Sequence, residues 1–165
     1  MLNRRSALIC VALSAIGFVN LDELASAAEE SSANTELNSK LFDRYVAAIN
    51  GHDVSSFAEI FTNGYVQHSG RSPSGLEAQV ANFKHLLELW PDLQMHVEDR
   101  IISNDKIVAR LTFTATHSRT VAAIPPTGRK ISFGTIDIWR VENGKLAEHW
   151  DLVDTPGMLR QLKGE

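Results

Sequence analysis

The stretch ISFGTIDIWRVENGKLAEHWDLV, residues 131–153, carries the clearest structural signal in the sequence. Two runs rich in β-branched and aromatic residues flank Asn143-Gly144, a combination typical of a β-hairpin. Successive side chains of a strand point to opposite faces, so His149 and Asp151 point one way and Trp150 the other. This arrangement fits either a plain surface strand or a pocket that needs a base beside an imidazole.

The register of the hairpin depends on its turn. A two-residue turn at Asn143-Gly144 places Asp151 opposite Ile136, whereas a bulged turn places Thr135 opposite Asp151 and Asp137 opposite His149. The bulged register separates polar from apolar residues better, and we therefore predict it. One face then carries Phe133, Thr135, Asp137, Trp139, His149 and Asp151, and the other carries Ile136, Ile138, Leu146, Trp150 and Leu152.

The polar face of this hairpin has the residue types of an acid/base site. A carboxylate half-buried among aromatic rings loses hydration, which raises its pKa toward the range of a general base. A neighbouring imidazole can hold a proton or orient the carboxylate. The hairpin alone is equally compatible with a solvated strand face whose residues are merely polar.

The N-terminus has the features of a secretory signal peptide. Arg4 and Arg5 precede an uncharged run over residues 7–19, and Ala25-Ser26-Ala27 supplies small residues for cleavage after position 27. We expect residues 1–27 to be removed by the ordinary or the twin-arginine route, which leaves a periplasmic or secreted protein. Residues 28–36 are predicted to be a flexible lead-in, and residues 37–163 the folded domain.

Composition limits the possible partners. The only cysteine, Cys10, falls in the signal peptide, so the mature chain relies on its core, and roughly 130 residues suffice for one domain. A net charge of −4 without a basic patch argues against nucleic acid and against a membrane partner for the mature form. No histidine pair has helical metal-ligand spacing and the mature chain has no cysteine ligand, so no metal site is predicted. Nucleophile-elbow and phosphate-loop motifs are also absent from the sequence.

The order of predicted elements indicates an α+β fold with helices on one face of an antiparallel sheet. Hydrophobic periodicity predicts a helix from Leu37 to Asn50, a short helix after Asp53 ending at Asn63-Gly64, and a helix over 76–89. An extended segment is expected at residues 65–70. Strands are predicted over 93–102, 106–117 and 131–141, and from Lys145 onward.

Two further histidines are weaker candidates for contact with a ligand. His68 could reach the mouth of a pocket or form a hydrogen bond within a loop. His117 ends a predicted strand and could contact the ligand or be a core histidine that a backbone carbonyl satisfies.

The run THSRTVAAIPPTGRKISFGTIDIWRVENGKLAEHWDLVDTPGMLRQL resembles the SnoaL-like polyketide cyclase family, also known as ester cyclases. YVQHSG and the helix over 76–89 also match, so the resemblance covers nearly all of residues 37–162. It implies an NTF2-like cone, in which three helices pack against a strongly curved antiparallel sheet that encloses an apolar pocket. It also implies acid/base chemistry without a cofactor.

The resemblance assigns roles to particular residues. Asp151 stands where the family's cyclases carry the aspartate that abstracts a proton from an activated carbon. Asp137 stands where they carry a pocket histidine, and Gln67 where they carry an asparagine near the substrate. Phe133, Thr135 and Trp139 share the pocket face and are predicted to contact the substrate.

Two functions therefore follow from the sequence. The first is an exported enzyme that uses Asp151 as a base, with His149 and Asp137 beside it, for aldol cyclisation, isomerisation or lyase chemistry on a small apolar molecule. A hydrolase on the same fold is a variant of it. The second is a non-catalytic module that binds a small hydrophobic ligand. The apolar outer face of the sheet predicts a homodimer in either case.

Overall fold

The computed structural model describes residues 20–165, which form helices and strands in mixed order. Arg4, Arg5, Cys10 and the apolar run over 7–19 lie outside these residues. The elements are α1 (Leu21–Asn50), α2 (Phe57–Ile60), β1 (Phe61–Gln67), α3 (Leu76–Leu89), β2 (Gln94–Ile102), β3 (Lys106–Thr116), β4 (Lys130–Glu142), β5 (Lys145–Val153) and α4 (Thr155–Lys163). The predicted α+β class is confirmed.

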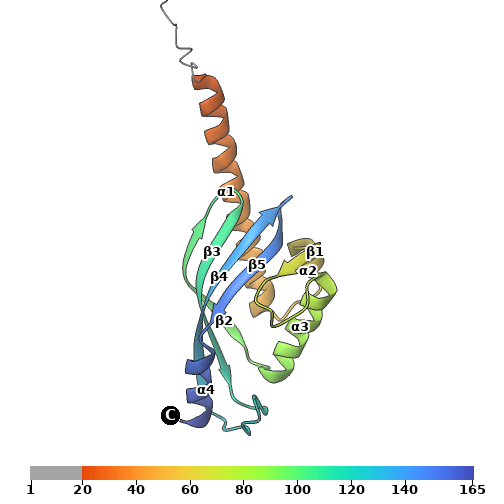
Figure 1. The fold of residues 1–165 in the computed structure, drawn as a ribbon, viewed down its shortest axis with the longest axis vertical. Coiled ribbons are helices and arrows are strands. Elements are labelled where there is room, and N and C mark those ends of the chain that lie inside the picture. The colour runs from red at the N-terminus through yellow and green to blue at the C-terminus, as the bar shows by residue number, and fades with distance from the viewer. Residues whose placement is uncertain (1–19) are drawn as a thin grey trace, which may run out of the picture.

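Helix α1 is longer than the sequence pattern predicts. Asn20 caps its start by accepting a hydrogen bond from the Asp22 backbone N–H. Residues 28–36, predicted to be a flexible lead-in, are helical and mostly exposed, because alanine and glutamate favour helix even without packing. This part of α1 extends beyond the sheet (Figure 1). Among residues 20–165, no helix is both long enough and apolar enough to cross a membrane.

The five strands form one curved, open sheet in the order β1-β5-β4-β3-β2. Strands β2 to β5 pair antiparallel as expected, but β1 pairs parallel with β5. The expected short helix is only four residues long, and the chain enters β1 at Phe61 instead of residue 65. Helix α3 then carries the chain away before β2 begins, which leaves β1 at the far edge of the sheet beside β5 (Figure 1).

The hairpin turn differs from the predicted one. Asn143 and Gly144 have φ values of 50° and 69° and pair Glu142 with Lys145, which is a two-residue turn instead of the bulged turn. The bulge lies further along β5, where Val141 pairs with Leu146 and Arg140 already pairs with Glu148. Ala147 is therefore the extra residue.

This displaced bulge preserves the predicted inner face but alters the register. Asp137 lies opposite Asp151, and Trp139 lies opposite His149, so these four side chains share one face. Leu146 precedes the bulge and is fully buried on the inner side, which corrects its assignment to the outer face. Ile136 and Leu152 remain on the outer face and are exposed.

The sequence pattern did not predict helix α4. Asp154 caps it by accepting a hydrogen bond from the Gly157 N–H at 2.9 Å, and Gly164 ends it with a φ of 84°. Its Leu162 is fully buried. The inner face of the sheet, the second half of α1, α2 and α3 share one hydrophobic core, with Phe42, Phe57, Phe61 and Trp139 at its centre.

Candidate functional site

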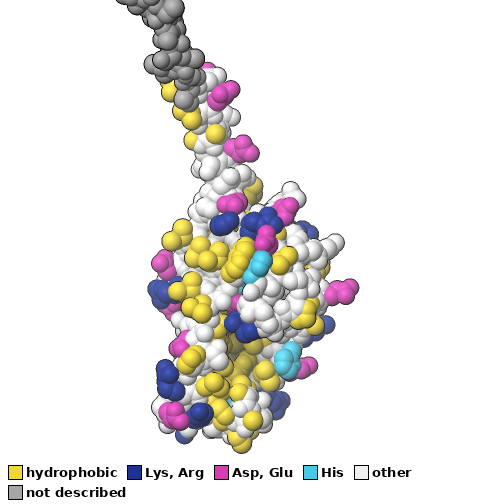
Figure 2. Space-filling view, viewed as in Figure 1, with side chains coloured by type: hydrophobic (Ala, Val, Ile, Leu, Met, Phe, Trp, Pro, Cys, Tyr) yellow, Lys and Arg dark blue, Asp and Glu magenta, His cyan; other side chains and the backbone are white. Residues whose placement is uncertain are grey.

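A cavity of about 430 Å³ lies between the inner face of the sheet and α3. Figure 2 shows a hollow with hydrophobic side chains beside the α2–α3 part of the molecule. Its walls are mainly apolar, and among them are Phe83, Leu86, Trp90, Phe113, Phe133 and Met158. A concave, mostly apolar volume with a few polar groups is typical of a site for a small organic molecule.

A buried hydrogen-bond network forms the polar wall of this cavity. The Asp137 carboxylate accepts from His149 Nε2 at 2.8 Å through Oδ1 and from the Thr135 hydroxyl through Oδ2. Gln67 Nε2 lies 3.0 Å from His149 Nδ1, and Gln67 Oε1 accepts from the Ser69 backbone N–H at 3.2 Å. The indole of Trp139 stacks on the imidazole at 4.9 Å with 7° between the planes.

These contacts define which nitrogen of His149 carries a proton. An amide NH₂ only donates, so Nδ1 accepts from Gln67 and the ring proton resides on Nε2. That proton is donated to Asp137. The network therefore holds the imidazole in one orientation, with Nε2 toward Asp137 and Nδ1 toward Gln67.

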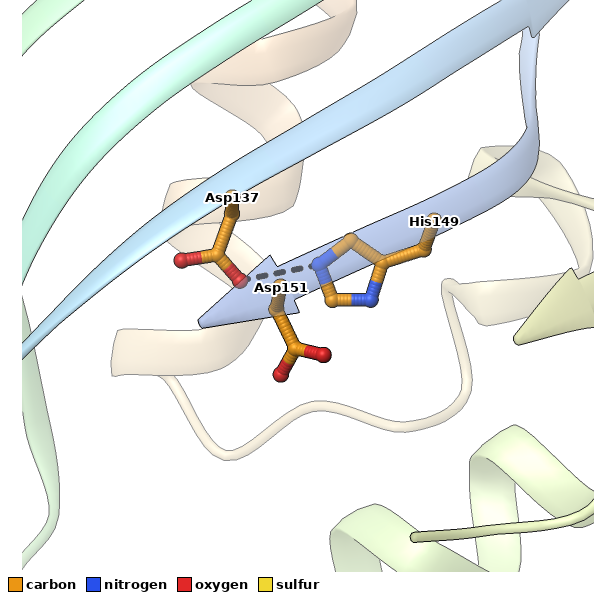
Figure 3. Close-up of side chains that lie close together, drawn as sticks. All are labelled: Asp137, His149 and Asp151. Atoms are coloured by element: carbon orange, nitrogen blue, oxygen red, sulfur yellow. Dashed lines mark hydrogen bonds and ion pairs between the residues drawn. The ribbon is translucent and has the colours of Figure 1, made fainter. Parts of the chain in front are cut away.

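Asp151 lies beside this network but does not take part in it. Figure 3 shows Asp137 on β4 and His149 and Asp151 on β5, gathered on one side of the sheet. Asp151 Oδ1 is buried without a hydrogen-bond partner, and Oδ2 accepts from the Arg71 guanidinium. Asp151 therefore offers an uncommitted carboxylate oxygen among residues that line the cavity.

A tyrosine faces the same cavity from helix α1. Burial raises the pKa of Tyr45 well above its usual range, and the Asp137 carboxylate raises it further. The pKa of Tyr65 is raised by burial, then by Tyr45 and Asp137, and its hydroxyl has no hydrogen-bond partner. The Tyr45 phenol therefore stays protonated and can donate a hydrogen bond to a ligand.

Asp137, His149 and Asp151 also form a possible set of metal ligands. One donor atom from each lies within 4.8 Å of the others, and an imidazole with two carboxylates suits a divalent cation. Asp137 Oδ1 and His149 Nε2 are hydrogen-bonded to each other, and Asp151 Oδ2 is paired with Arg71. A cation would have to displace at least the first of these contacts.

The cavity brings together six of the nine predicted site residues: Gln67, Phe133, Thr135, Asp137, His149 and Asp151. Trp139 lies behind His149 and is 1% exposed. His68 lies outside the cavity, where it stacks on Trp150 at 4.3 Å and contacts Glu148.

His117 is also outside the cavity. It is completely buried, and its Nδ1 lies 2.9 Å from the Thr127 hydroxyl, while its carbonyl accepts from the N–H groups of Thr127 and Gly128. These contacts fasten the loop between β3 and β4, so His117 has a structural role.

Several cavity residues were not found from the sequence. Arg71 lies in the β1–α3 loop, Tyr45 on α1, and Gln79 and Asn82 on α3. Tyr45 looked like one more apolar position of its helix, and the loop around Arg71 has no periodicity. An arginine in a Ser/Gly/Pro loop that directly follows a pocket strand was the available signal.

The chain belongs to the SnoaL-like polyketide cyclase family, whose model matches residues 39–162. Among solved structures, TsrD from Streptomyces laurentii is 30% identical, with a TM-score of 0.72 and coverage of 79% of this chain and 97% of that one. AclR from Streptomyces galilaeus is 27% identical, with a TM-score of 0.67 and coverage of 81% and 87%. A SnoaL-like polyketide cyclase from Agrobacterium tumefaciens is 23% identical, with a TM-score of 0.68 and coverage of 76% and 97%, and supports the fold alone.

These matches confirm the predicted NTF2-like cone and the family resemblance. A search of the curated proteins gave no match. Family membership suggests a cyclase-type function without a cofactor.

Proposed function

We propose that the chain is an exported enzyme that removes a proton next to a carbonyl group of a small apolar substrate, with Asp151 as the general base. The observation that carries this proposal is the buried, unpartnered Oδ1 of Asp151 beside an apolar cavity. A general base must reach its proton directly, and this oxygen has no competing partner among the described residues.

In the proposed reaction, the substrate's C–H bond breaks and its proton passes to Asp151. The electron pair moves into the carbonyl group and forms an enolate, to which the Tyr45 phenol can donate a hydrogen bond. In an aldol cyclisation, the enolate carbon attacks a second carbonyl carbon of the same molecule, and the oxygen formed there takes the proton back. Isomerisation and lyase reactions share the first step.

Asp137 and His149 do not take the substrate's proton but affect Asp151, the first by its charge and the second by its position. The Asp137 carboxylate lies close enough to Asp151 for the two charges to repel each other, which favours proton uptake by Asp151. His149, held by Asp137 and Gln67, presents a rigid surface beside the reacting carbon.

The test uses 2-tetralone, an apolar ketone, dissolved in D₂O, with loss of its α-proton signals followed by NMR. We expect the wild-type protein to accelerate this exchange, and Asp151→Asn to reduce the acceleration on the order of a hundredfold or more. His149→Ala should reduce it less. Asp99→Asn, an exposed aspartate of β2, is the matched control and should leave it unchanged.

The same experiment addresses the non-catalytic alternative. A binding module would bind 2-tetralone without accelerating exchange, and Asp151→Asn would change only its affinity. Full exchange activity in Asp151→Asn would show that another group is the base.

Export is the remaining part of the proposal and rests on the order of arginines, apolar run and small residues before position 28. A mature N-terminus at Ala28 in the exported protein is the expected result of N-terminal sequencing.

A further inference from the structure

Arg71 is the only lysine or arginine among the cavity residues, which all belong to the described part of the chain. It lies in the eight-residue loop between the end of β1 and the start of α3. Its side chain is 50% exposed, whereas the Asp151 side chain that it contacts is 8% exposed. Arg71 therefore lies at the cavity mouth, with one side in solvent and its guanidinium on the proposed base inside.

The contact between Arg71 and Asp151 has a consequence for the proposed chemistry. A guanidinium against a carboxylate stabilises the charged form and makes the carboxylate a poorer proton acceptor. The half-exposed arginine stays hydrated when it leaves this pair, whereas the buried carboxylate then lacks its counterion and takes up a proton more readily. The pair thus weakens the base without removing it, because Oδ1 has no partner among the described residues, and Arg71 can be drawn away from the solvent side.

The charges around the cavity also restrict how an anionic ligand would lie. Asp137 and Asp151 place two carboxylates on the sheet wall, which repel an anion there. Arg71 offers the compensating charge at the mouth, and a carboxylate can accept two parallel hydrogen bonds from a guanidinium. The space beyond has apolar walls, among them Phe113, Phe133 and Leu86.

We propose that the substrate is an apolar molecule with a carboxylate group that binds Arg71 at the cavity mouth and thereby makes Asp151 a stronger base than it is with a neutral ketone. This inference rests on the proposed function and adds the substrate class and a device that couples binding to activation. The cavity volume of about 430 Å³ suits an aromatic or alicyclic acid of two or three rings.

Binding of 2-naphthoate and of its neutral amide, 2-naphthamide, measured by calorimetry tests the proposal without any turnover. We expect the wild-type protein to bind the carboxylate about tenfold or more tightly than the amide, as a charge-assisted contact to arginine would produce. Arg71→Gln should abolish this preference by weakening naphthoate binding alone. Arg44→Gln, an exposed arginine of α1, is the matched control and should keep it.

Asp151→Asn provides an independent measurement. Because this substitution removes the anion that occupies Arg71, it should tighten naphthoate binding several-fold and leave naphthamide binding unchanged. Equal affinities for the two compounds in the wild-type protein, equal losses for both in Arg71→Gln, or no naphthoate binding at millimolar concentration would each overturn the inference.

The two proposals fail separately. A protein that accelerates exchange of 2-tetralone without preferring the carboxylate keeps Asp151 as its base and loses the role of Arg71. A protein that prefers the carboxylate but never accelerates exchange is a binding module for organic acids, which retains the substrate class and overturns the catalytic role.

Discussion

Asp137 organises the polar wall of the cavity because it accepts hydrogen bonds from two neighbouring side chains at once. Its two oxygens bind the Thr135 hydroxyl and His149 Nε2, and Gln67 completes the contacts of the imidazole. Both ring nitrogens of His149 and both oxygens of Asp137 have a partner, so the network fixes His149 before any ligand binds. Removing one member of such a buried network destabilises the fold, because its former partners are left buried without hydrogen bonds.

Asp137→Leu should therefore lower the free energy of unfolding by about 3 kcal/mol or more, because it leaves the Thr135 hydroxyl and the His149 N–H buried without acceptors. Asp137→Asn retains one acceptor oxygen and the side-chain volume and should lose about 1 kcal/mol. Urea denaturation of the three proteins measures both differences. A Leu variant as stable as the wild type would mean that water or another group satisfies these donors.

The residues that the sequence predicted and those that it missed differ in how they reach the cavity. His149, Asp151 and Asp137 lie on two adjacent strands, where alternation alone defines the face. Arg71 and Tyr45 arrive from a loop and from a helix, and their positions depend on how α1 and the β1–α3 loop pack over the sheet. Local pattern does not encode that packing, which is why neither residue was predicted.

At the scale of elements, the hairpin illustrates how a correct face can follow from an incorrect turn. The predicted bulge at Gly144 and the observed bulge at Ala147 both add one residue to β5 before His149. Each therefore puts His149 and Asp151 on the same face as Asp137. Leu146, between the two positions, changes sides, and its burial was the part that sequence alternation could not reveal.

The parallel edge strand β1 has a different origin. Its residues look like a short extended segment, and nothing local distinguishes a parallel from an antiparallel partner. The position of β1 beside β5 follows from the path of the chain through α3. The predicted helices and antiparallel strands came from hydrophobic periodicity and the family resemblance, whereas α4 and the pairing of β1 depended on tertiary contacts.

Asp92, just after α3, joins three elements and should make stability depend on pH. Its carboxylate accepts hydrogen bonds from the Thr116 N–H and hydroxyl at the end of β3 and from Lys130 at the start of β4. The hydrogen bonds from Thr116, followed by that from Lys130, hold the pKa of Asp92 well below its usual range.

Because the folded-state pKa of Asp92 is depressed, its stabilisation is present above the unfolded-state pKa of about 3.9 and is lost as the pH falls toward the folded-state value. We expect Asp92→Asn to be less stable than the wild type at neutral pH, and the difference to shrink below about pH 4. Thermal unfolding at pH 7, 5, 4 and 3 measures it. A difference that stays constant across this range would exclude titration of Asp92 as its cause.

At the scale of the whole molecule, one face of the sheet packs on the core, and the other is open and carries an apolar patch between charged residues such as Arg110 and Arg140. Across the outer face, Ile101, Val108, Ile138 and Trp150 lie opposite one another on four consecutive strands, and Ile136 and Leu152 form the adjoining row. Ile101, Ile136 and Leu152 are at least half exposed. A contiguous apolar surface of this kind is unusual on a monomer.

We propose that a second copy of the chain covers this face, since its two apolar rows adjoin each other and can pack against the same rows of a second copy about a two-fold axis. Light scattering coupled to gel filtration at micromolar concentration should give a dimeric mass. Replacing Ile136 and Leu152 by lysine places charges in the centre of the face and should give a monomer that keeps its folded circular dichroism. Leu37→Lys introduces the same charge at an exposed leucine of α1 and should leave the dimer intact. A monomeric wild-type protein would refute the proposal.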